Sequence, residues 1–401
     1  MIYVFYFFAA VMVFLGYKSL RGGINYLSFF RRELARPKSL YTPFCSVIVP
    51  CRGLDEDLHD NLSALFSQDF PQAEIIFVVD DEQDESVAVI KELSRQAVKS
   101  ARLIVAGRAI DASQKVHNLR RAVLEVSGKS EVFVFMDSDA RPGKDWLRNL
   151  IAPLHDESNG CATGYRWFVQ KSGGFSTHLR SVWNASIASA LGANLKNNFC
   201  WGGSLAIRRE TFERLNIGEK WRGTLSDDFA VTRAMKEADL PVCFVPQCLT
   251  ATVEDCTFKE FLEFSTRQMK ITRVYAAPLW MASLIGSFLF TAIFWTGVLL
   301  LFVVSGIHFW LTFLLLALVF ALGFGKAWLR LKAVKLILKN YENELNQQFL
   351  PQVMLWAVTP IVYFYNCVGA LFSRKIIWRG IEYKLKSATE TVVLSTNKSL
   401  N

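Results

Sequence analysis

The sequence predicts an α/β fold, with a doubly wound parallel or mixed sheet, placed between transmembrane helices. Two observations lead to this prediction. Between residues 44 and 265, short apolar runs of strand character alternate with stretches of helical periodicity, an order typical of doubly wound sheets. Long apolar runs flank this region on both sides, and 52% of the 401 residues are hydrophobic. The chain therefore combines one globular domain with membrane segments.

The alternation can be followed along the chain. Strands are predicted at 44–50, 74–79, 102–106, 131–136, 160–169, 205–208 and 241–246. Helices are predicted between them at 57–67, 85–98, 114–126, 144–154, 176–195 and 228–238. The strand runs are rich in β-branched and aromatic residues. No Pro/Gly-rich linker interrupts the region before residue 275, so we interpret it as a single domain.

Four apolar runs are candidates for the membrane: 1–17, 280–304, 309–325 and 353–372. A bilayer core of ~30 Å needs about 20 residues of helix, so 280–304 spans readily and the two later runs are marginal. The first run lacks a preceding basic segment and a small-residue cleavage site, which favours an uncleaved anchor over a signal peptide. Pro360 offers the last run a way to break into a re-entrant segment.

The expected organisation along the chain follows from these runs. It comprises an anchor (1–17), a basic juxtamembrane segment (18–43), the catalytic domain (44–265), an interfacial helix (266–279), a transmembrane hairpin (280–325), a basic connector (326–352), a spanning or re-entrant segment (353–372) and a basic tail (373–401).

The basic residues that give the net charge of +9 cluster beside the ends of the apolar runs. Lys and Arg cluster after the first and third apolar runs, whereas the turn Ser305–His308 has none. The positive-inside rule then places the central domain in the cytoplasm, and the basic tail favours the same side. This distribution gives no nucleic-acid surface, and no protein partner is inferred. The eight cysteines form no CxxC pair, which suits reduced, buried thiols.

Three acidic clusters carry the chemistry: Asp80-Asp81, Asp137-Ser138-Asp139 and Asp227-Asp228. The first two follow predicted strands, where open α/β sheets bind their ligands. An isolated Asp there is more often a cap or turn residue, but two such clusters on parallel strands favour a functional site. Carboxylates in an Asp-x-Asp pattern suit Mg²⁺ or Mn²⁺ bridging to a diphosphate.

Roles can be assigned on this basis. We expect Asp139 to hold the metal with Asp137 beside it, and Asp81 to lie near the base and ribose of a nucleotide. Asp228 is the expected general base, because a base should come from outside the metal shell. Asp227 is assigned with it to the acceptor side, although a helix N-cap explains this pair equally well.

Several cations also point to a diphosphate. Arg267 and Lys270 lie three residues apart on a helical face, and interfacial snorkelling is their alternative explanation. Lys115 opens a helix, a suitable place for phosphate. Pro50 ends the first predicted strand and Arg52 follows it. Both are predicted to contact the nucleotide, although a plain surface arginine explains Arg52 equally well.

A glycine-rich turn, Trp201-Gly202-Gly203, is predicted to let the acceptor approach the backbone. A plain turn is the competing interpretation.

The ordered set SVIVPCRG, FVVDDEQDES, QKVHNL, MDSDARP, CWGGSLAIRRE, TLSDDFAVT and RQMKIT resembles family 2 glycosyltransferases of the GT-A fold. It is most similar to the ceramide glucosyltransferase branch, with its bacterial relatives. The resemblance covers about residues 40–275 and extends weakly to 377–383.

The resemblance implies an inverting transfer from a UDP-sugar with a divalent metal. By motif, Asp81 matches the first family aspartate, Asp137 and Asp139 the second, and Asp228 the catalytic base. The family's closing motif falls on 267–271, where Lys270 and Ile271 replace its Arg-Trp pair. Lysine keeps the charge but loses the bidentate fork of arginine.

We therefore expect a membrane-bound enzyme that moves a hexose, glucose by resemblance, from a UDP-sugar to a ceramide-like or diacylglycerol-like hydroxyl. It would act at the cytoplasmic leaflet, in a bacterial inner membrane, with Mg²⁺ or Mn²⁺. The alternatives are a processive polysaccharide synthase, a polyprenyl-phosphate glycosyltransferase and an inactive lipid-binding regulator.

Overall fold

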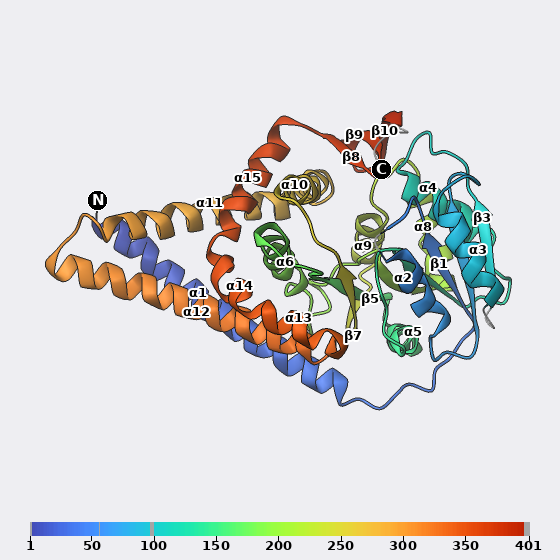
Figure 1. Ribbon diagram of the computed structural model, residues 1–401, viewed down its shortest axis with the longest axis horizontal. Helices are drawn as coiled ribbons and strands as arrows, with labels where there is room; N and C mark the ends of the chain where they lie inside the picture. Colours follow the sequence, from blue (N-terminus) through green and yellow to red (C-terminus); the bar gives the residue numbers. More distant parts are fainter. Residues whose placement is uncertain (1, 56, 97–99, 397–401) are drawn as a thin grey trace. The chain divides into compact units, whose positions relative to one another are not determined.

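The computed structural model describes residues 2–55, 57–96 and 100–396, and Figure 1 labels its elements. The chain divides into two units. The sheet unit comprises Glu33–Phe168, Ala190–Glu254 and Arg374–Asn401. The membrane unit comprises Met1–Arg32, Val169–Ser189 and Asp255–Ser373. Each unit is described here by itself.

The sheet unit is built on a seven-stranded sheet of order β3-β2-β1-β4-β6-β5-β7. Its strands are β1 (Cys45–Pro50), β2 (Ala73–Val79), β3 (Ala101–Val105), β4 (Val132–Met136), β5 (Cys161–Val169), β6 (Ser204–Arg208) and β7 (Val242–Val253). The pairs β1–β2, β1–β4 and β2–β3 are parallel, whereas β6 is antiparallel to both β4 and β5. The sheet is therefore mixed: parallel on one side of β4 and antiparallel on the other.

Helices connect these strands. They are α2 (Leu58–Phe66), α3 (Ser86–Gln96), α4 (Gln114–Val123), α5 (Trp146–Ile151), the 3-10 turn η1 (Ala152–His155), α7 (Arg209–Arg214), α8 (Ile217–Lys220) and α9 (Asp227–Glu237). The predicted helix 85–98 runs past Gln96 into positions outside the described residues. The predicted strand 241–246 is the first half of a longer strand, β7.

One apolar core holds α4 and α9 against the sheet. Val116 of α4 and Val231 of α9 are buried with Ile48, Phe135 and Trp221. Burying large apolar side chains of this kind contributes about 1.5–3 kcal/mol each. This packing fixes the positions of the N-terminal ends of both helices.

A second, three-stranded antiparallel sheet lies in the segment predicted as a basic tail. Its order is β10-β9-β8, with β8 (Lys375–Trp378), β9 (Ile381–Ser387) and β10 (Glu390–Thr396). Arg379 and Gly380 join β8 to β9 with φ values of 50° and 72°, as a tight hairpin turn of type I′ requires. Left-handed backbone costs a non-glycine residue about 1–2 kcal/mol, so Arg379 is a strained position. Positions 397–401 of the predicted tail lie outside the described residues.

The membrane unit is helical. Its elements are α1 (Ile2–Leu34), α6 (Phe175–Ala188), α10 (Phe258–Tyr275), α11 (Ala277–Leu300), α12 (Gly306–Lys335), η2 (Lys339–Tyr341), α13 (Glu342–Gln347), α14 (Phe349–Met354), η3 (Leu355–Ala357) and α15 (Thr359–Phe372). By length and composition, α1, α11 and α12 can each cross a membrane. The segments Phe349–Ala357 and Thr359–Phe372 are bent by 58°, and the break lies just before Pro360.

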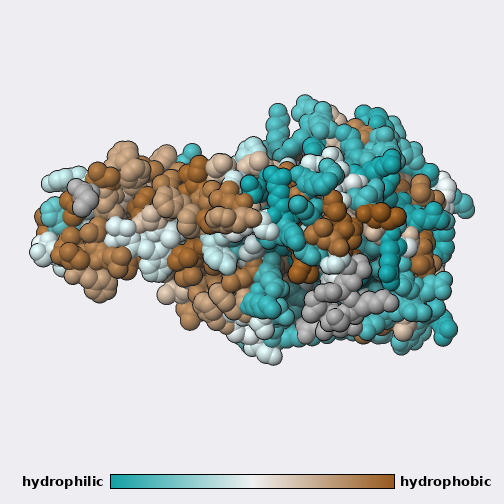
Figure 2. Space-filling model, turned by 90° about the horizontal axis from the view of Figure 1, so that it is seen from above, coloured by the Kyte–Doolittle hydropathy of each residue, from teal (hydrophilic) through white to brown (hydrophobic). Residues whose placement is uncertain are grey.

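Apolar side chains cover the outside of these three helices. Phe14, Leu299, Phe302 and Trp310 are all more than half exposed, and such side chains appear in brown in Figure 2. Exposed apolar surface on this scale fits contact with lipid. The predicted anchor 1–17 is the first half of α1, whose helix continues through basic residues to Leu34; position 1 lies outside the described residues.

Small residues let α1 and α12 approach closely. A Cβ atom added at Gly23 would lie 3.4 Å from the Cα of Lys326, and one added at Gly16 would lie 3.2 Å from Leu322. Small residues at helix contacts are the usual means of close packing in membranes.

Candidate active site

The parallel half of the sheet brings three loops to one edge. The strands β1, β2 and β4 are neighbours with the same direction, so their carboxyl ends meet where open α/β sheets bind ligands. Pro50 ends β1, and Arg52 follows it. The Arg52 guanidinium pairs with the Asp80 carboxylate that follows β2.

A buried lysine joins two of the predicted acidic clusters. The Nζ of Lys115, in the first turn of α4, lies 2.7 Å from Asp137 Oδ1 and 3.2 Å from Asp227 Oδ1. Burial alone would lower the pKa of Lys115, but the carboxylates of Asp137, Asp227 and Asp228 outweigh it and raise the pKa. Burial likewise opposes ionisation of Asp137, yet Lys115 prevails and lowers the pKa of that carboxyl. Lys115 and Asp137 therefore form a charged pair.

Asp139 lies in a different electrostatic environment. Burial raises the pKa of its carboxyl to about 6, with Arg166 opposing the shift and Asp137 adding to it. Its Oδ2 is 3.5 Å from Arg166 Nη1. Its Oδ1 is buried and has no hydrogen-bond partner within the described part of the chain. A buried carboxylate oxygen left without a donor is a site at which a cation would be favourable.

The donor set fits a divalent cation that is shared with a substrate. Across residues 2–55, 57–96 and 100–396, no three His, Cys, Asp or Glu side chains are grouped to hold a metal ion. Mg²⁺ is usually bound by one or two carboxylates, with waters and substrate phosphates completing its shell. Asp137 and Asp139 suit that mode, and Asp139 Oδ1 is the free oxygen.

The second sheet contributes a cation to this group. The Arg379 guanidinium, at the tip of the β8–β9 hairpin, pairs with Asp55, and Ser138 Oγ donates to the other Asp55 oxygen at 2.6 Å. Arg52 Nε donates to the Arg379 carbonyl at 3.0 Å, and Arg379 Nη1 donates to the Arg52 carbonyl at 3.2 Å. Burial opposes the charge on Arg379, but Asp55 and then Asp139 outweigh it and raise the pKa.

Tyr383 anchors the same hairpin. Its hydroxyl oxygen accepts a hydrogen bond from the backbone N–H of Gln114, at 3.1 Å. Burial raises the pKa of Tyr383 to about 12, so the phenol stays protonated at neutral pH. The strand β9 is thus attached to the start of the helix that carries Lys115.

The two carboxylates that begin α9 differ. Asp227 is only 2% exposed, and burial raises its pKa to about 6 against the opposing charge of Lys115. Asp228 is more exposed, and its Oδ1 accepts from Phe229 N–H at 2.7 Å and from the Ser226 hydroxyl. Its Oδ2 has only a 3.5 Å approach from Gly202 N–H. Asp227 Oδ2 is buried and has no hydrogen-bond partner among the described residues, so of this pair Asp228 has the carboxylate that is more accessible to a ligand.

The glycine-rich turn has no room for side chains. A Cβ atom at Gly202 would lie 2.1 Å from Asp227 Oδ2 and 2.9 Å from Lys115 Nζ. One at Gly203 would lie 2.2 Å from the Trp201 ring. The guanidinium of Arg166 lies over that ring, 5.4 Å from its centre. The close packing of this turn against Asp227, Lys115 and the Trp201 ring therefore requires glycine at both positions, and the approach of an acceptor to this backbone stays a prediction.

Two predicted groups of residues have other contacts. Asp81 is 47% exposed and its carboxylate is 3.9 Å from Arg108, so it is Asp80 that connects to the cluster through Arg52. Arg267 and Lys270 lie on α10 in the membrane unit. The Arg267 guanidinium is 5.7 Å from the Phe264 ring centre, and burial lowers the pKa of Lys270. Their role at a diphosphate stays a prediction.

Sequence reasoning gave no role to Asp55, Arg166, Arg379 and Tyr383. For two of these residues the sequence contains a pattern that could have indicated their importance. Arg166 interrupts a run of otherwise apolar strand residues, and a charged residue in such a place is usually paired. Arg379-Gly380 separates two runs of strand character, a pattern typical of hairpin turns. The contact of that turn with Asp55 joins residues more than three hundred positions apart and leaves no local trace.

An open α/β sheet with this edge of carboxylates and cations, in a chain with membrane helices, defines a glycosyltransferase of membrane type. The family model described as glycosyl transferase family 21 matches residues 4–391. The chain belongs to glycosyl transferase family 21, and the predicted glycosyltransferase class and fold class are confirmed.

Curated relatives agree with the expected branch. Ceramide glucosyltransferase 1 of Caenorhabditis elegans is 30% identical over 199 residues, 48% of this chain and 42% of that protein. Ceramide glucosyltransferase 3 of the same organism is 29% identical over 102 residues, 24% of this chain and 22% of that protein. The matched part thus spans less than half of the length of either relative.

A solved structure also aligns with the chain. It is the mannosyltransferase PcManGT from Pyrobaculum calidifontis, in complex with GDP-Man and Mn²⁺, at 17% identity and a TM-score of 0.45, covering 91% of this chain and 99% of that one.

Proposed function

We propose that the protein transfers a hexose, with glucose as the expected sugar, from a UDP-sugar to the hydroxyl of a membrane lipid. The observation that carries the proposal is the partly buried Asp139 carboxylate, whose buried Oδ1 has no hydrogen-bond partner among the described residues and lies in a cluster with three cations. Arg166 contacts it, and Arg379 and Lys115 pair with its neighbours. This cluster of carboxylates and cations suits a diphosphate that is bound through a bridging divalent cation.

The donor end of the site follows from these contacts. Asp137 and Asp139 would hold Mg²⁺ or Mn²⁺, which supplies Lewis-acid stabilisation of the departing diphosphate. Lys115 and Arg379 are already charged by their carboxylate neighbours, so they are prepared to bind phosphate oxygens without gaining a proton. Arg52 holds the backbone of Arg379 and positions it.

The acceptor end is assigned to Asp228. Its free Oδ2 would accept the proton of the lipid hydroxyl as the hydroxyl oxygen attacks the anomeric carbon and the bond to UDP breaks, which inverts that carbon. Asp227 is too buried to take this part, and we assign it the positioning of Lys115. Trp201, Gly202 and Gly203 would line the approach of the acceptor.

Two lines of support favour a lipid acceptor. Three helices are long and apolar enough to cross a membrane, and the curated relatives are named ceramide glucosyltransferases. An acceptor with a ceramide-like or diacylglycerol-like hydroxyl is consistent with both observations. The positive-inside distribution supports action at the cytoplasmic leaflet. From sequence, Arg267 and Lys270 are proposed to balance the charge on departing UDP.

The proposal is tested by transfer assays on the full chain in lipid. Extracted lipids, a UDP-sugar and Mn²⁺ are supplied, and the products are identified by mass spectrometry. Asp228→Asn should lower transfer by about 10²-fold or more, since a general base contributes that much, while UDP binding persists. A matched control is Asp239→Asn, at the other end of α9, where the residue is exposed and has a φ of 50° that Asn tolerates.

Each contrary outcome has a definite meaning. Parent-like transfer by Asp228→Asn would remove the base from its role. Polymeric products would indicate a processive synthase, and a sugar attached to an acceptor phosphate would indicate a polyprenyl-phosphate enzyme. No UDP release with any lipid would favour the inactive regulator.

A further inference from the structure

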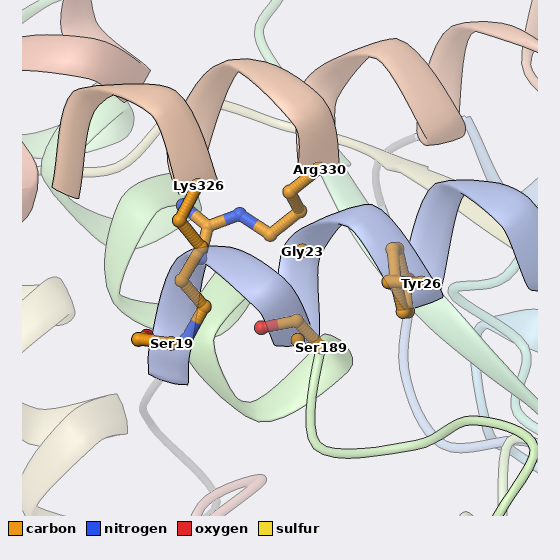
Figure 3. A pocket seen from close by; sticks show the side chains of 7 residues that line it. Ser19, Gly23, Tyr26, Ser189, Lys326 and Arg330 are labelled. Carbon is orange, nitrogen blue, oxygen red and sulfur yellow. The ribbon is translucent and has the colours of Figure 1, made fainter. Parts of the chain in front are cut away.

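A small cavity with two cationic side chains in its lining lies between α1 and α12 within the membrane unit. It has a volume of about 120 Å³ and is lined by Gly22, Gly23 and Tyr26 of α1, by Lys326 and Arg330 of α12, and by Ser189 after α6. Figure 3 shows Lys326 and Arg330 reaching from one helix towards the helix that carries Tyr26. A water molecule occupies ~30 Å³ in the liquid, so the cavity has room for a group the size of a phosphate.

The two cations in this cavity lack acidic partners. Within the part of the chain that the structure describes, neither Lys326 nor Arg330 forms an ion pair. Arg330 is only 5% exposed, and a buried cation without a counter-charge is costly. An anion that enters the cavity would therefore neutralise these two cations and stabilise them.

The cavity is also preorganised for a ligand. Arg330 Nη2 donates to Gln352 Oε1 at 3.0 Å, and Gln352 Nε2 donates to Ser181 Oγ at 3.1 Å, so the guanidinium is held in place from behind. Arg330 Nε and the hydroxyl of Tyr26 are buried without hydrogen-bond partners among the described residues. Tyr26 is itself 5% exposed. Two unpartnered donors and a free ammonium thus line one small space.

The position along the helix indicates which anion is available. At about 1.5 Å per residue, Lys326 lies ~30 Å along α12 from Gly306, which is the thickness of a bilayer core. The helix surface between them is rich in exposed apolar side chains, among them Trp310, Phe313 and Leu314. Lys326 and Arg330 therefore lie at the headgroup level on the basic side of the membrane, where lipid phosphates are concentrated.

We propose that this cavity binds the phosphate of an anionic phospholipid. Lys326, Arg330 and the Tyr26 hydroxyl would contact the phosphate oxygens, while Gly22, which has nothing within 4 Å of its Cβ position, leaves room for the headgroup. The acyl chains would lie along the apolar surface of α1 and α12. The site lies within the membrane unit, and lipid binding there needs neither the sugar donor nor turnover. The binding test can therefore succeed or fail whether or not the proposed glycosyl transfer is correct.

The test measures lipid binding by native mass spectrometry of the full chain in detergent. Phosphatidylglycerol and phosphatidylcholine are titrated separately, and inorganic phosphate is added as a competitor. We expect one phosphatidylglycerol to bind more tightly than any phosphatidylcholine. Lys326→Met should weaken that event about tenfold or more, the effect of losing one charged hydrogen bond.

A second variant leaves both cations in place. A side chain at Gly22 would meet nothing within 4 Å at its Cβ, so Gly22→Leu fills the cavity without disturbing helix packing and should also weaken binding. The matched control is Lys332→Met. Lys332 is exposed on the same helix and lies 4.6 Å from the Trp328 ring centre, outside the cavity. It should keep the parent affinity.

Three results would overturn the proposal. Equal affinity for the two lipids would show no selection for negative charge. Complete displacement by inorganic phosphate at matched concentrations would indicate a simple anion site. An equal loss in Lys332→Met would indicate general surface attraction.

Discussion

Lys115 is the residue on which the charge balance of the active site depends. It is the shared partner of Asp137 and Asp227, and these two carboxylates would otherwise be buried together. A sequence shows the acidic clusters directly, because Asp137 follows a strand and Asp227 begins a helix. It does not show which cation neutralises them, since that partner comes from another part of the chain.

We predict that Lys115→Met destabilises the protein by about 3 kcal/mol or more, because breaking a buried ion pair leaves an uncompensated charge. Chemical denaturation of the detergent-solubilised chain would measure this change, and transfer should be lost in parallel. Lys236→Met provides the control. Lys236 is exposed in the last turn of α9, and surface changes of this kind alter stability by about 0.5 kcal/mol at most. Equal stability of parent and Lys115→Met would mean that the carboxylates are neutralised by other groups.

Asp80 and Asp81 have different partners, which the sequence does not show. In the folded loop Asp80 pairs with Arg52 and Asp81 lies near Arg108, while the nucleotide contact of Asp81 stays a prediction. Side-chain direction at a strand end depends on the turn that follows, and two adjacent aspartates give the sequence no means of choosing.

At the scale of elements, the hairpin β8–β9 is the part that the sequence did not reveal. The strands β1, β2 and β4 could be predicted nearly to their bounds, because continuous apolar runs are typical of buried parallel strands. In β9, Glu and Lys alternate with apolar residues, whereas β8 is a single lysine followed by three apolar residues, and the many basic residues of the segment led to its prediction as a basic tail. The antiparallel direction of β6 was equally invisible, since strand direction depends on tertiary connections.

We predict that Arg379→Asn raises the KM for the UDP-sugar about 10- to 100-fold, the cost of losing a charged hydrogen bond. Asparagine accepts the left-handed backbone that this turn requires, so the hairpin should keep its shape. Steady-state kinetics with varied donor would measure the change. Arg374→Asn removes a charge at the exposed base of the hairpin, where Arg374 bonds only the Lys386 carbonyl, and should leave KM unchanged. A parent-like KM for Arg379→Asn would separate the hairpin from donor binding.

For the whole molecule, composition alone distinguished the membrane helices from the catalytic domain. Hydropathy reports whether a segment is apolar enough for lipid, and α1, α11 and α12 satisfy that criterion. It does not show how far a helix continues past its apolar part. The helix α1 extends through Leu34 because Lys, Arg and Leu have good helix propensity, which outweighs the unfavourable Gly22-Gly23 pair.

We predict from the positive-inside rule that the Ser305–His308 turn faces away from the cytoplasm. Ser305→Cys in intact cells should therefore react with a membrane-impermeant maleimide, whereas Asp145→Cys in the sheet unit should react only after lysis. Background labelling should be low, because seven of the eight native cysteines are buried and Cys256 is partly buried. Labelling of Asp145→Cys in intact cells would reverse the orientation.

The place of Arg379 in the chain has a consequence for biosynthesis. This residue is translated after α15, the last of the membrane unit's helices, yet it pairs with Asp55 beside the first strand. A ribosome must therefore complete every bilayer segment before the pocket acquires its final arginine. The nascent polypeptide would stay catalytically silent until insertion is finished, and a premature stop codon before the hairpin would yield a product without this arginine.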